Sequence, residues 1–562
     1  MTRIFPALIA VVLAGCGTDV TGPSSSLLSC VFGDPVHSEV GEVLQVRGTG
    51  HDAMCLAGDG STEYLYVPFW ATADTSRQLN LGLTGAGVGD VADAADFGVV
   101  SIDVADPTLA LFDRRRRVRD YAFHDRLRAR EIEELGPMIR AGAAPAAALA
   151  PVATPDVPAV GEMRDFNVAI SCTETDIRTG EVMDVSDHAV VYADTGNPAD
   201  LTPDDYRYFG LTFDTLVHRV ETAYFGEPTD IDGNGRAILF FTRAVNERNP
   251  RGAEAVTIGF FWSGDLFPEN ATDRLQACPA SNHSEMFYLI APDPTGEAGA
   301  AFTLDDVRHL AIPLIGHEFQ HLINASRRLF VNNADTFEAP WLNEGLSHVA
   351  EELLYFDVAR LQTGRNLNID SVRNARAPAD TFFNRYMGAN FNNFAKYLSR
   401  PDTASLMGEA NDLSTRGAVW NFLRYAADRS ALSDTAFFFD LVNGTGAGVS
   451  NLNTVLGGDD AFDWMRDWTV SVFADDRVEG LEPRFRSETW NLRSIYEGST
   501  LNRFPLRVST LGNGESTTVD LLAGGATFNR FGVRADGRAA LHVEAGGRAP
   551  PSTLRGSFLR IR

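Results

Sequence analysis

The chain has 562 residues, of which 44% are hydrophobic and 22% are charged, and its formal net charge is −27 at pH 7. This length exceeds what one hydrophobic core supports, so we expect several folded domains. The negative charge repels polyanions, which argues against nucleic acid as the main partner and favours an extracytoplasmic protein. A basic run does not change this, because its pattern is typical of a solvated helix face. That run comprises Arg114 to Arg117, Arg119, Asp120, Asp125, Arg126 and Arg128.

The N-terminal residues have the pattern of a secretory signal. Arg3 precedes an apolar run from Ile4 to Leu13, which is too short to span a bilayer. The run ends in Leu-Ala-Gly-Cys16, which resembles the lipobox of bacterial lipoproteins, where cleavage precedes a cysteine that is then acylated. We therefore predict a signal peptide over 1–15 and a polar tether over 16–27. A lipid on Cys16 would then attach the protein to a bacterial outer membrane or cell surface. Alternatively, the segment is an ordinary signal peptide, the cysteine is incidental, and the protein is secreted.

Four cysteines remain after Cys16, an even number that suits disulfides in an oxidising compartment. Three pairings are possible. We prefer Cys30 with Cys55 and Cys172 with Cys278, because each bridge then stays inside one predicted domain. A zinc site made from these cysteines is disfavoured, since no two of them have the Cys-x2-Cys spacing.

Hydrophobic patterning divides the remaining chain. Short β-branched and aromatic runs such as Val43–Arg47 and Tyr64–Phe69 predict strands near the N-terminus, and alternation such as Leu506–Val508 predicts strands near the C-terminus. The predicted units, in chain order, are an N-terminal β-rich domain (28–108), a charged helical arm (109–140), an Ala/Pro-rich linker (141–164), a central domain (165–480) and a C-terminal β-sandwich domain (490–562).

The central domain is predicted to begin with strands and helices and to continue with helices. Strands are expected at Phe166–Ile170, His188–Tyr192, Ala237–Thr242 and Met286–Ile290. Helices are expected at Pro203–Phe225, Trp341–Phe356, Gly417–Arg429, Thr435–Val442 and Phe462–Ala474. A further long helix starts at Thr303, whose hydroxyl can cap it together with Asp306. Pro313 removes one hydrogen bond of this helix, so the helix either kinks there or starts nearby.

Within this helix, Gly316–His321 reads Gly-His-Glu-Phe-Gln-His, an instance of His-Glu-x-x-His. Imidazoles four residues apart lie one turn above each other, so His317 and His321 can bind one zinc ion. Glu318 points about 100° away, which suits a general base that acts on water at the metal. An exposed polar turn is the alternative, but the apolar flanks predict a buried helix, and buried imidazoles need polar partners.

A catalytic zinc site needs a third protein ligand. A metzincin would need glycine at Asn324 and histidine at Arg327, so that class is excluded. Glu344 lies 23 residues after His321, in the first turn of a predicted second helix, and would complete a His2Glu set. Alternatively, Glu344 binds no metal and is a negative charge that the helix dipole favours at a helix N-terminus. Reserve ligands are His348, Glu351, Glu338 and Asp335.

The sequence His-Glu-Phe-Gln-His-Leu-Ile-Asn (317–324), followed by Trp-Leu-Asn-Glu-Gly-Leu-Ser-His-Val-Ala-Glu-Glu-Leu (341–353), resembles the hyicolysin family of secreted zinc peptidases, within the broader gluzincins. The resemblance covers about residues 165–476. It implies a zincin-type α+β core with a mixed sheet, flanked here by small all-β sandwich-like domains. It also implies zinc held by His317, His321 and Glu344, Glu318 as the base, and a protein or peptide substrate.

The chain departs from this resemblance at two positions. Gluzincins often place an aspartate four residues after the ligand glutamate to orient a zinc histidine, whereas this chain has His348 there. The tyrosine of the family before the later Gly-Ala is Arg416 here. The group that stabilises the oxyanion is therefore open, and Tyr386 and His348 are candidates.

Asp230, Asp232, Asn234 and Gly235 follow the opening half of a calcium-binding loop. The twelfth position is Phe241, where a bidentate glutamate belongs, so an Asx-rich turn is the alternative to a calcium site. For the whole chain we expect a zinc-dependent endopeptidase. The competing hypothesis is a catalytically silent surface adhesin or polymer-binding lipoprotein on the same fold.

Overall fold

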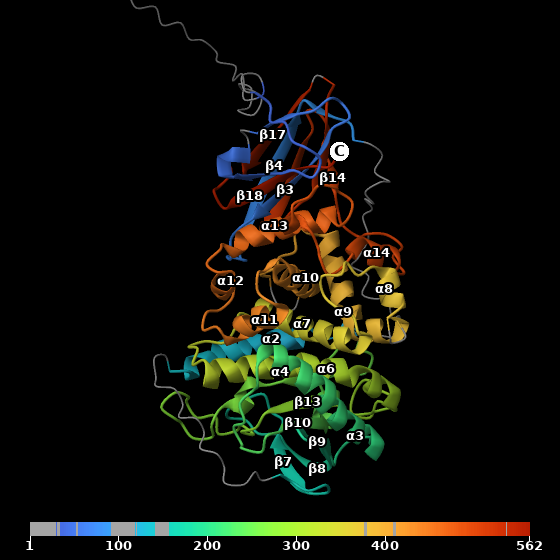
Figure 1. The fold of residues 1–562 in the computed structure, drawn as a ribbon. Coiled ribbons are helices and arrows are strands. Elements are labelled where there is room, and N and C mark those ends of the chain that lie inside the picture. Colours follow the sequence, from blue (N-terminus) through green and yellow to red (C-terminus); the bar gives the residue numbers. More distant parts are fainter. Residues whose placement is uncertain are drawn as a thin grey trace, which may run out of the picture.

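The computed structural model describes residues 30, 34–51, 54–91, 118–119, 121–140, 157–253, 255–375, 379–408, 412–535 and 537–562. The predicted signal peptide and the whole predicted tether, including Cys16, lie outside these residues, as do Arg114 to Arg117 and most of the predicted linker. Within them, no helix is both long enough and apolar enough to cross a membrane. Three layers follow one another along the molecule: a β-sandwich, a group of helices, and a mixed sheet with its own helices (Figure 1).

The sandwich is built from both ends of the chain. One sheet has the order β1 (Val43–Arg47), β18 (Leu554–Arg560), β3 (Glu63–Trp70), β16 (Asn529–Val533) and β14 (Ser509–Thr510), with β5 (Val88–Gly89) also paired to β16. The other has the order β15 (Ser516–Leu522), β4 (Gln78–Ala86), β17 (Arg538–Ala545) and β2 (Cys55–Ala57). The two terminal β-rich regions predicted as separate domains therefore form one sandwich.

Strand β3 shows why the two regions combine. Its eight residues are all buried, and it pairs on one side with β18 and on the other with β16. Tyr64 and Tyr66 face the sandwich interior, whereas Leu65 and Val67 belong to the large core shared with the helices. A strand that is apolar on both faces needs a sheet partner on each edge and a layer on each face, and the N-terminal region alone does not supply them.

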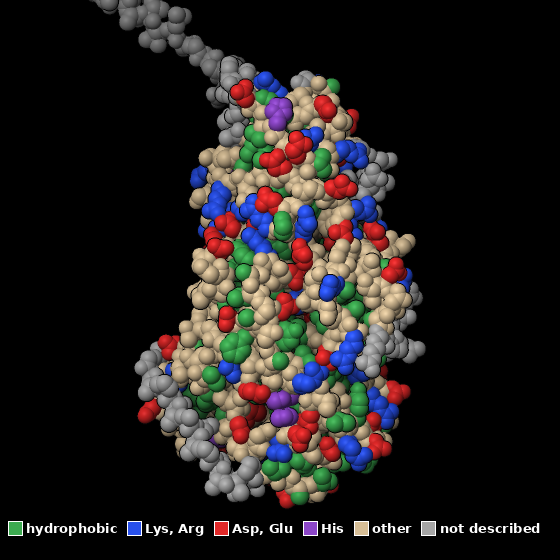
Figure 2. Space-filling model, in the orientation of Figure 1, with side chains coloured by type: hydrophobic (Ala, Val, Ile, Leu, Met, Phe, Trp, Pro, Cys, Tyr) green, Lys and Arg blue, Asp and Glu red, His purple; other side chains and the backbone are tan. Residues whose placement is uncertain are grey.

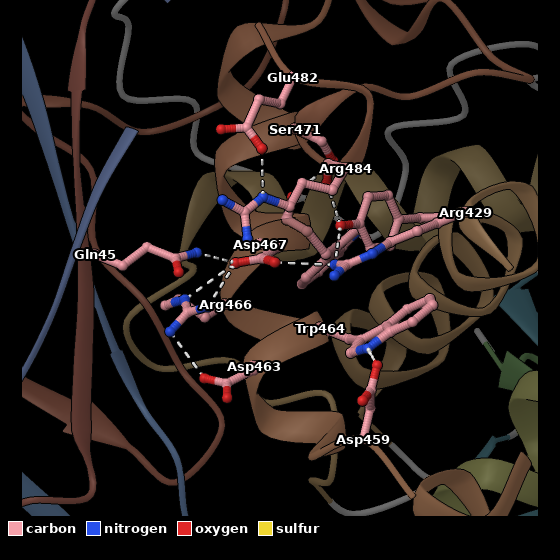
Figure 3. A network of polar contacts seen from close by, with 12 residues as sticks. Gln45, Arg429, Asp459, Asp463, Trp464, Arg466, Asp467, Ser471, Glu482 and Arg484 are labelled. Atoms are coloured by element: carbon pink, nitrogen blue, oxygen red, sulfur yellow. Dashed lines mark hydrogen bonds and ion pairs between the residues drawn. The ribbon is translucent and has the colours of Figure 1, made fainter. Parts of the chain in front are cut away.

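Polar contacts attach the sandwich to the helical layer. Asp467, on α13 (Ala461–Ala474), accepts hydrogen bonds from Gln45 of β1 at 2.7 Å and from Arg429 at 3.0 Å (Figure 3). Arg555 of β18 pairs with Asp460 at 2.6 Å.

On the face drawn in Figure 2, acidic and basic side chains are interspersed along the length of the molecule.

The mixed sheet has the order β12 (Gly259–Phe261), β13 (Met286–Ile290), β10 (Ala237–Thr242), β9 (Ala189–Asp194), β8 (Ile177–Val185) and β7 (Met163–Asn167). Its three central strands are parallel, and every residue of β10 and β13 is buried. Such continuous apolar runs are typical of parallel strands covered on both faces. The expected strands at Ala237–Thr242 and Met286–Ile290 are thus present with the predicted bounds.

Helices surround this sheet and fill the middle layer. They are α2 (Tyr121–Arg130), α3 (Pro203–Thr212), α4 (Arg219–Phe225), α5 (Arg243–Asn246), α6 (Leu304–Ser326), α7 (Pro340–Ala359), α8 (Ile369–Arg373), α9 (Ala379–Ser399), α10 (Leu413–Arg429), α11 (Asp434–Asn443), α12 (Val449–Val455), α13 and α14 (Leu492–Glu497). A π-helical turn joins α3 to α4. A short two-stranded sheet pairs β6 (Val118–Arg119) of the arm with β11 (Ala255–Val256).

Two disulfides are present among the described residues, with sequence separations of 25 and 106. Cys30 is bonded to Cys55, and Cys172 to Cys278. The preferred pairing is therefore confirmed. The first bridge joins Cys30 to β2 of the sandwich, and the second joins the loop after β7 to the segment before β13.

Candidate metal centre

Helix α6 carries the His-Glu-x-x-His motif through the protein interior. Thr303 accepts a hydrogen bond from the Asp306 N–H, and the Asp306 side chain accepts from the Thr303 N–H, so the predicted capping box is present. The helix runs unbroken through Pro313, and every residue from Ala311 to Ser326 is buried. The exposed-turn alternative for the motif is therefore wrong.

Two glycines let α7 approach its neighbours closely. A Cβ on Gly316 would lie 2.4 Å from Leu354 Cδ1 of α7, and a Cβ on Gly345 of α7 would lie 2.6 Å from Val419 Cγ1 of α10. At either position a larger side chain would force the neighbouring side chain to shift. The close α6–α7 contact brings Glu344, in the first turns of α7, to the histidines of α6.

The structure places His317, His321 and Glu344 in one buried cluster. The Nε2 atom of His317 lies 3.4 Å from Glu344 Oε2, and the Nε2 atom of His321 lies 3.6 Å from Glu344 Oε1. Donors around a tetrahedral ion with bonds of about 2.0–2.1 Å are about 3.3 Å apart. The three side chains can therefore hold a divalent metal ion with little movement.

Neighbouring side chains orient the ring of His321. Its Nδ1 atom lies 3.1 Å from Asn343 Oδ1, to which it can donate a hydrogen bond, and in that tautomer the lone pair of Nε2 faces Glu344. The Ser347 hydroxyl, which donates to Gln320 at 2.7 Å, lies 3.1 Å from the same Nδ1 atom. Metal-binding histidines are commonly fixed in this way by a partner on the second ring nitrogen.

Glu351 takes the corresponding position behind His317. Its Oε1 atom lies 3.2 Å from His317 Nδ1, on the side of the ring away from Glu344. Its Oε2 atom lies 3.3 Å from His348 Nδ1. Glu351 lies about one helical turn after His348, the position where the resemblance predicts an orienting aspartate, and it is Glu351 that contacts His317. Because His317, His348 and Glu351 could themselves hold an ion, His317 belongs to both possible ligand sets.

The charges of the cluster favour a cation between the two helices. Burial would raise the pKa of Glu344, but Arg416 and His321 hold it well below its ordinary value, so this side chain is a carboxylate. Burial opposes protonation of His317, yet Glu344 and Glu351 outweigh it and raise the pKa of this imidazole. Burial holds the pKa of His321 well below its ordinary range, which leaves a neutral ring suited to metal binding.

Glu318, the residue after His317, contacts the edge of the mixed sheet. Its Oε2 atom accepts a hydrogen bond from the N–H of Phe261, on the edge strand β12, at 3.0 Å. The charged arm holds that strand, because Arg128 donates to the Phe261 carbonyl at 2.7 Å and Glu131 accepts from the Ser263 N–H at 3.0 Å. Arg128 and Glu131 are buried and paired at 2.7 Å. The prediction that Arg128 lies on a solvated helix face is therefore wrong.

Three other residues named from the sequence, two reserve ligands and one candidate for oxyanion stabilisation, make contacts with other parts of the molecule. Glu338 is buried with Arg328 and accepts hydrogen bonds from Asn451 and the Gly448 N–H. Asp335 lies 3.9 Å from Arg274 and is more than half exposed. Tyr386 stacks on Phe382. By contrast, two side chains without a role in the sequence prediction lie at the cluster: Arg416, which is hydrogen-bonded to Glu344, and His124 of α2, whose ring centroid is 6.4 Å from that of His317.

A second acidic group lies at the start of the central strands. Oxygens of Asp230, Asp232 and Glu285 are all within 4.8 Å of one another. Asn234, which the sequence placed in this site, instead accepts a hydrogen bond from the Arg236 N–H and donates to Asp232. Glu285 was missed because it lies more than 50 residues from the loop in sequence.

Comparison with known proteins gives one partial similarity. The neutral metalloprotease ShpI of Staphylococcus hyicus is 24% identical to this chain over 153 residues, which are 27% of this chain and 32% of ShpI. The match thus spans about one third of that relative. No family model matches the chain. The similarity supports a metallopeptidase-like relationship, and the His/Glu cluster is compatible with a divalent metal ion.

Proposed function

We propose that this protein is a zinc-dependent endopeptidase that acts outside the cytoplasm. The observation that carries the proposal is the buried cluster in which Glu344 of α7 lies 3.4 Å from His317 and 3.6 Å from His321 of α6. A donor set of two imidazole nitrogens and one carboxylate is typical of catalytic zinc. The partial similarity to a neutral metalloprotease supports the same class.

Each side chain of the cluster has a distinct part in the proposed reaction. His317 and His321 would hold the ion through Nε2, and Glu344 would complete the set from the facing helix. Zinc supplies Lewis-acid chemistry there, which makes water nucleophilic at neutral pH. Glu318 accepts the proton of the attacking water and then delivers it to the leaving amine of the cleaved peptide.

The contacts of Glu318 support a role in catalysis. The Phe261 N–H donates to one of its oxygens from β12, the edge strand next to α6. Arg128 of the arm contacts the same strand, and Glu131 contacts the turn after it. A silent adhesin has no need of a glutamate held beside a metal centre. We therefore favour hydrolysis of a protein or peptide substrate over a purely adhesive function. The two disulfides fit an oxidising compartment, and attachment through a lipid on Cys16 is part of this proposal.

The test is Glu318→Gln in the full chain, assayed on casein with zinc content measured in parallel. Gln keeps an oxygen that can accept from Phe261 but cannot take a proton, so hydrolysis is expected to fall at least about 100-fold while bound zinc is unchanged. Asp305→Asn is the matched control, since it removes an exposed carboxylate from the same helix. If Glu318→Gln cleaves casein at the wild-type rate, Glu318 is not the base. If the wild type shows no chelator-sensitive cleavage, the protein is a binder.

A further inference from the structure

The loop before β10 and the residue before β13 meet at one edge of the mixed sheet. The two strands are parallel, with Ile238 beside Met286, so the residues that precede them are neighbours. The Ile238 N–H donates to the Glu285 carbonyl at 2.7 Å, which fixes this register at the sheet edge. The topology thus carries the Glu285 side chain to the acidic loop that starts at Asp230.

The loop itself is folded so that its carboxylates converge. Asp230 accepts a hydrogen bond from the Gly235 N–H at 3.0 Å, and Asp232 accepts from the Asn234 N–H at 3.2 Å. Gly235 has a φ of 69°, a left-handed conformation that favours glycine. In EF-hand loops, acidic ligands occupy alternate positions and a glycine makes a sharp turn at the sixth, which is where Gly235 lies relative to Asp230.

Glu285 is the observation that points to a ligand. Its side chain is 3% exposed, and Oε1 accepts from the Ile231 N–H at 2.9 Å. Its other oxygen, Oε2, is buried and has no hydrogen-bond partner. An unsatisfied carboxylate oxygen in the interior is costly unless a proton or a cation accompanies it. Burial, together with the nearby Asp232 and Asp230, raises the pKa of Glu285 to about 8.

The surroundings provide room for an ion with water ligands. A cavity of about 130 Å³ lies beside the cluster, and its lining includes His218, Asp230, Glu285 and Phe319. Phe319 belongs to α6, so the cavity connects the acidic cluster to the helix that carries the His-Glu-x-x-His motif. The cluster itself contains only oxygen donors, which suits a hard cation and not zinc.

We propose that Asp230, Asp232 and Glu285 bind calcium, with Glu285 replacing across the sheet edge the glutamate that an EF-hand loop carries at its twelfth position. Calcium accepts six to eight oxygen ligands at about 2.3–2.6 Å in flexible geometry, so a carboxylate from a neighbouring strand serves as well as one from the loop. The ion ties the loop to the ends of β10 and β13 and thereby stabilises the sheet on which α6 packs.

The test is calcium titration by calorimetry into full-length protein kept in zinc-supplemented, calcium-free buffer. We expect the wild type to bind one calcium ion per chain with a dissociation constant of about 1 mM or lower. Glu285→Gln keeps an oxygen for the Ile231 N–H and is expected to weaken binding at least about tenfold. Glu297→Gln, which removes a more exposed carboxylate paired with Arg243, is the control and is expected to bind as the wild type does.

Two results would overturn the proposal: no saturable calcium binding by the wild type up to about 10 mM, or the same affinity in Glu285→Gln as in the wild type. Circular dichroism checks that Glu285→Gln is folded. If it is not, Asp232→Asn gives the same comparison at a residue that is only partly buried, and unchanged affinity in that variant overturns the proposal. None of these readouts depends on hydrolysis, so the calcium site is tested independently of the proposed peptidase activity.

Discussion

Replacement of Glu351 by Gln is expected to weaken zinc binding without unfolding the protein. Glu351 lies 3.2 Å from His317 Nδ1 and holds the ring so that Nε2 faces Glu344. Partners of this kind typically change metal affinity by about 10–100-fold, equivalent to about 1.4–2.7 kcal/mol. The loss should stay within this range because Asn343 and Ser347 orient His321 separately.

The assay is competition for zinc between the protein and a chromophoric chelator at neutral pH. Glu352→Gln is the matched control, since Glu352 is the next residue of α7 and equally buried but pairs with Arg424 and Trp490 instead. The control is expected to lower stability and leave zinc affinity unchanged. Equal zinc affinity in Glu351→Gln and the wild type, or an equal loss in both variants, would refute the role of Glu351.

Three further predictions concern stability. Arg424→Met should lower the free energy of unfolding in urea by about 3–5 kcal/mol, because it strands the buried Glu352 that Arg424 neutralises; a loss below about 1 kcal/mol would contradict this. Burial raises the pKa of Asp265 to about 6, so the folded state holds this proton more tightly than the unfolded chain, and the resulting stability of about 3 kcal/mol is present below pH 4 and lost as the pH rises to about 6. Asp265→Asn should flatten that part of the stability profile, and an unchanged slope would exclude Asp265 as its source. Replacing Cys172 and Cys278 by serine opens a loop with a sequence separation of 106 and should cost about 4–5 kcal/mol, measured by thermal unfolding with and without reductant; equal stability would show that the bridge contributes nothing.

The elements that the sequence predicted well are those specified by local signals. The Thr303 cap and the apolar flanks of the motif define α6 within one stretch of chain. The runs at Ala237–Thr242 and Met286–Ile290 are apolar throughout, as buried parallel strands must be. The sequence also predicts that Glu344 meets His317 and His321, because Glu344 lies at the start of a predicted second helix and its segment resembles that of known zinc peptidases.

Contacts between distant segments had no comparable signal. Nothing in the pattern of β3 shows that it pairs with β18 and β16 from the other end of the chain. The burial of Arg128 depends on Glu131 and on the Phe261 carbonyl, more than 100 residues away. Glu351 could be ranked only as a reserve ligand, since its place behind His317 follows from the packing of α7 against α6. Such positions are set by tertiary structure and not by local periodicity.

Zinc content of the purified full chain tests the proposed centre most directly. We expect one zinc ion per chain in the wild type, and loss of tight binding in Glu344→Ala, because that change removes the carboxylate 3.4 Å from His317 and 3.6 Å from His321. Stoichiometric zinc retained by Glu344→Ala with wild-type affinity, or no zinc bound by the wild type in zinc-supplemented buffer, would contradict the account.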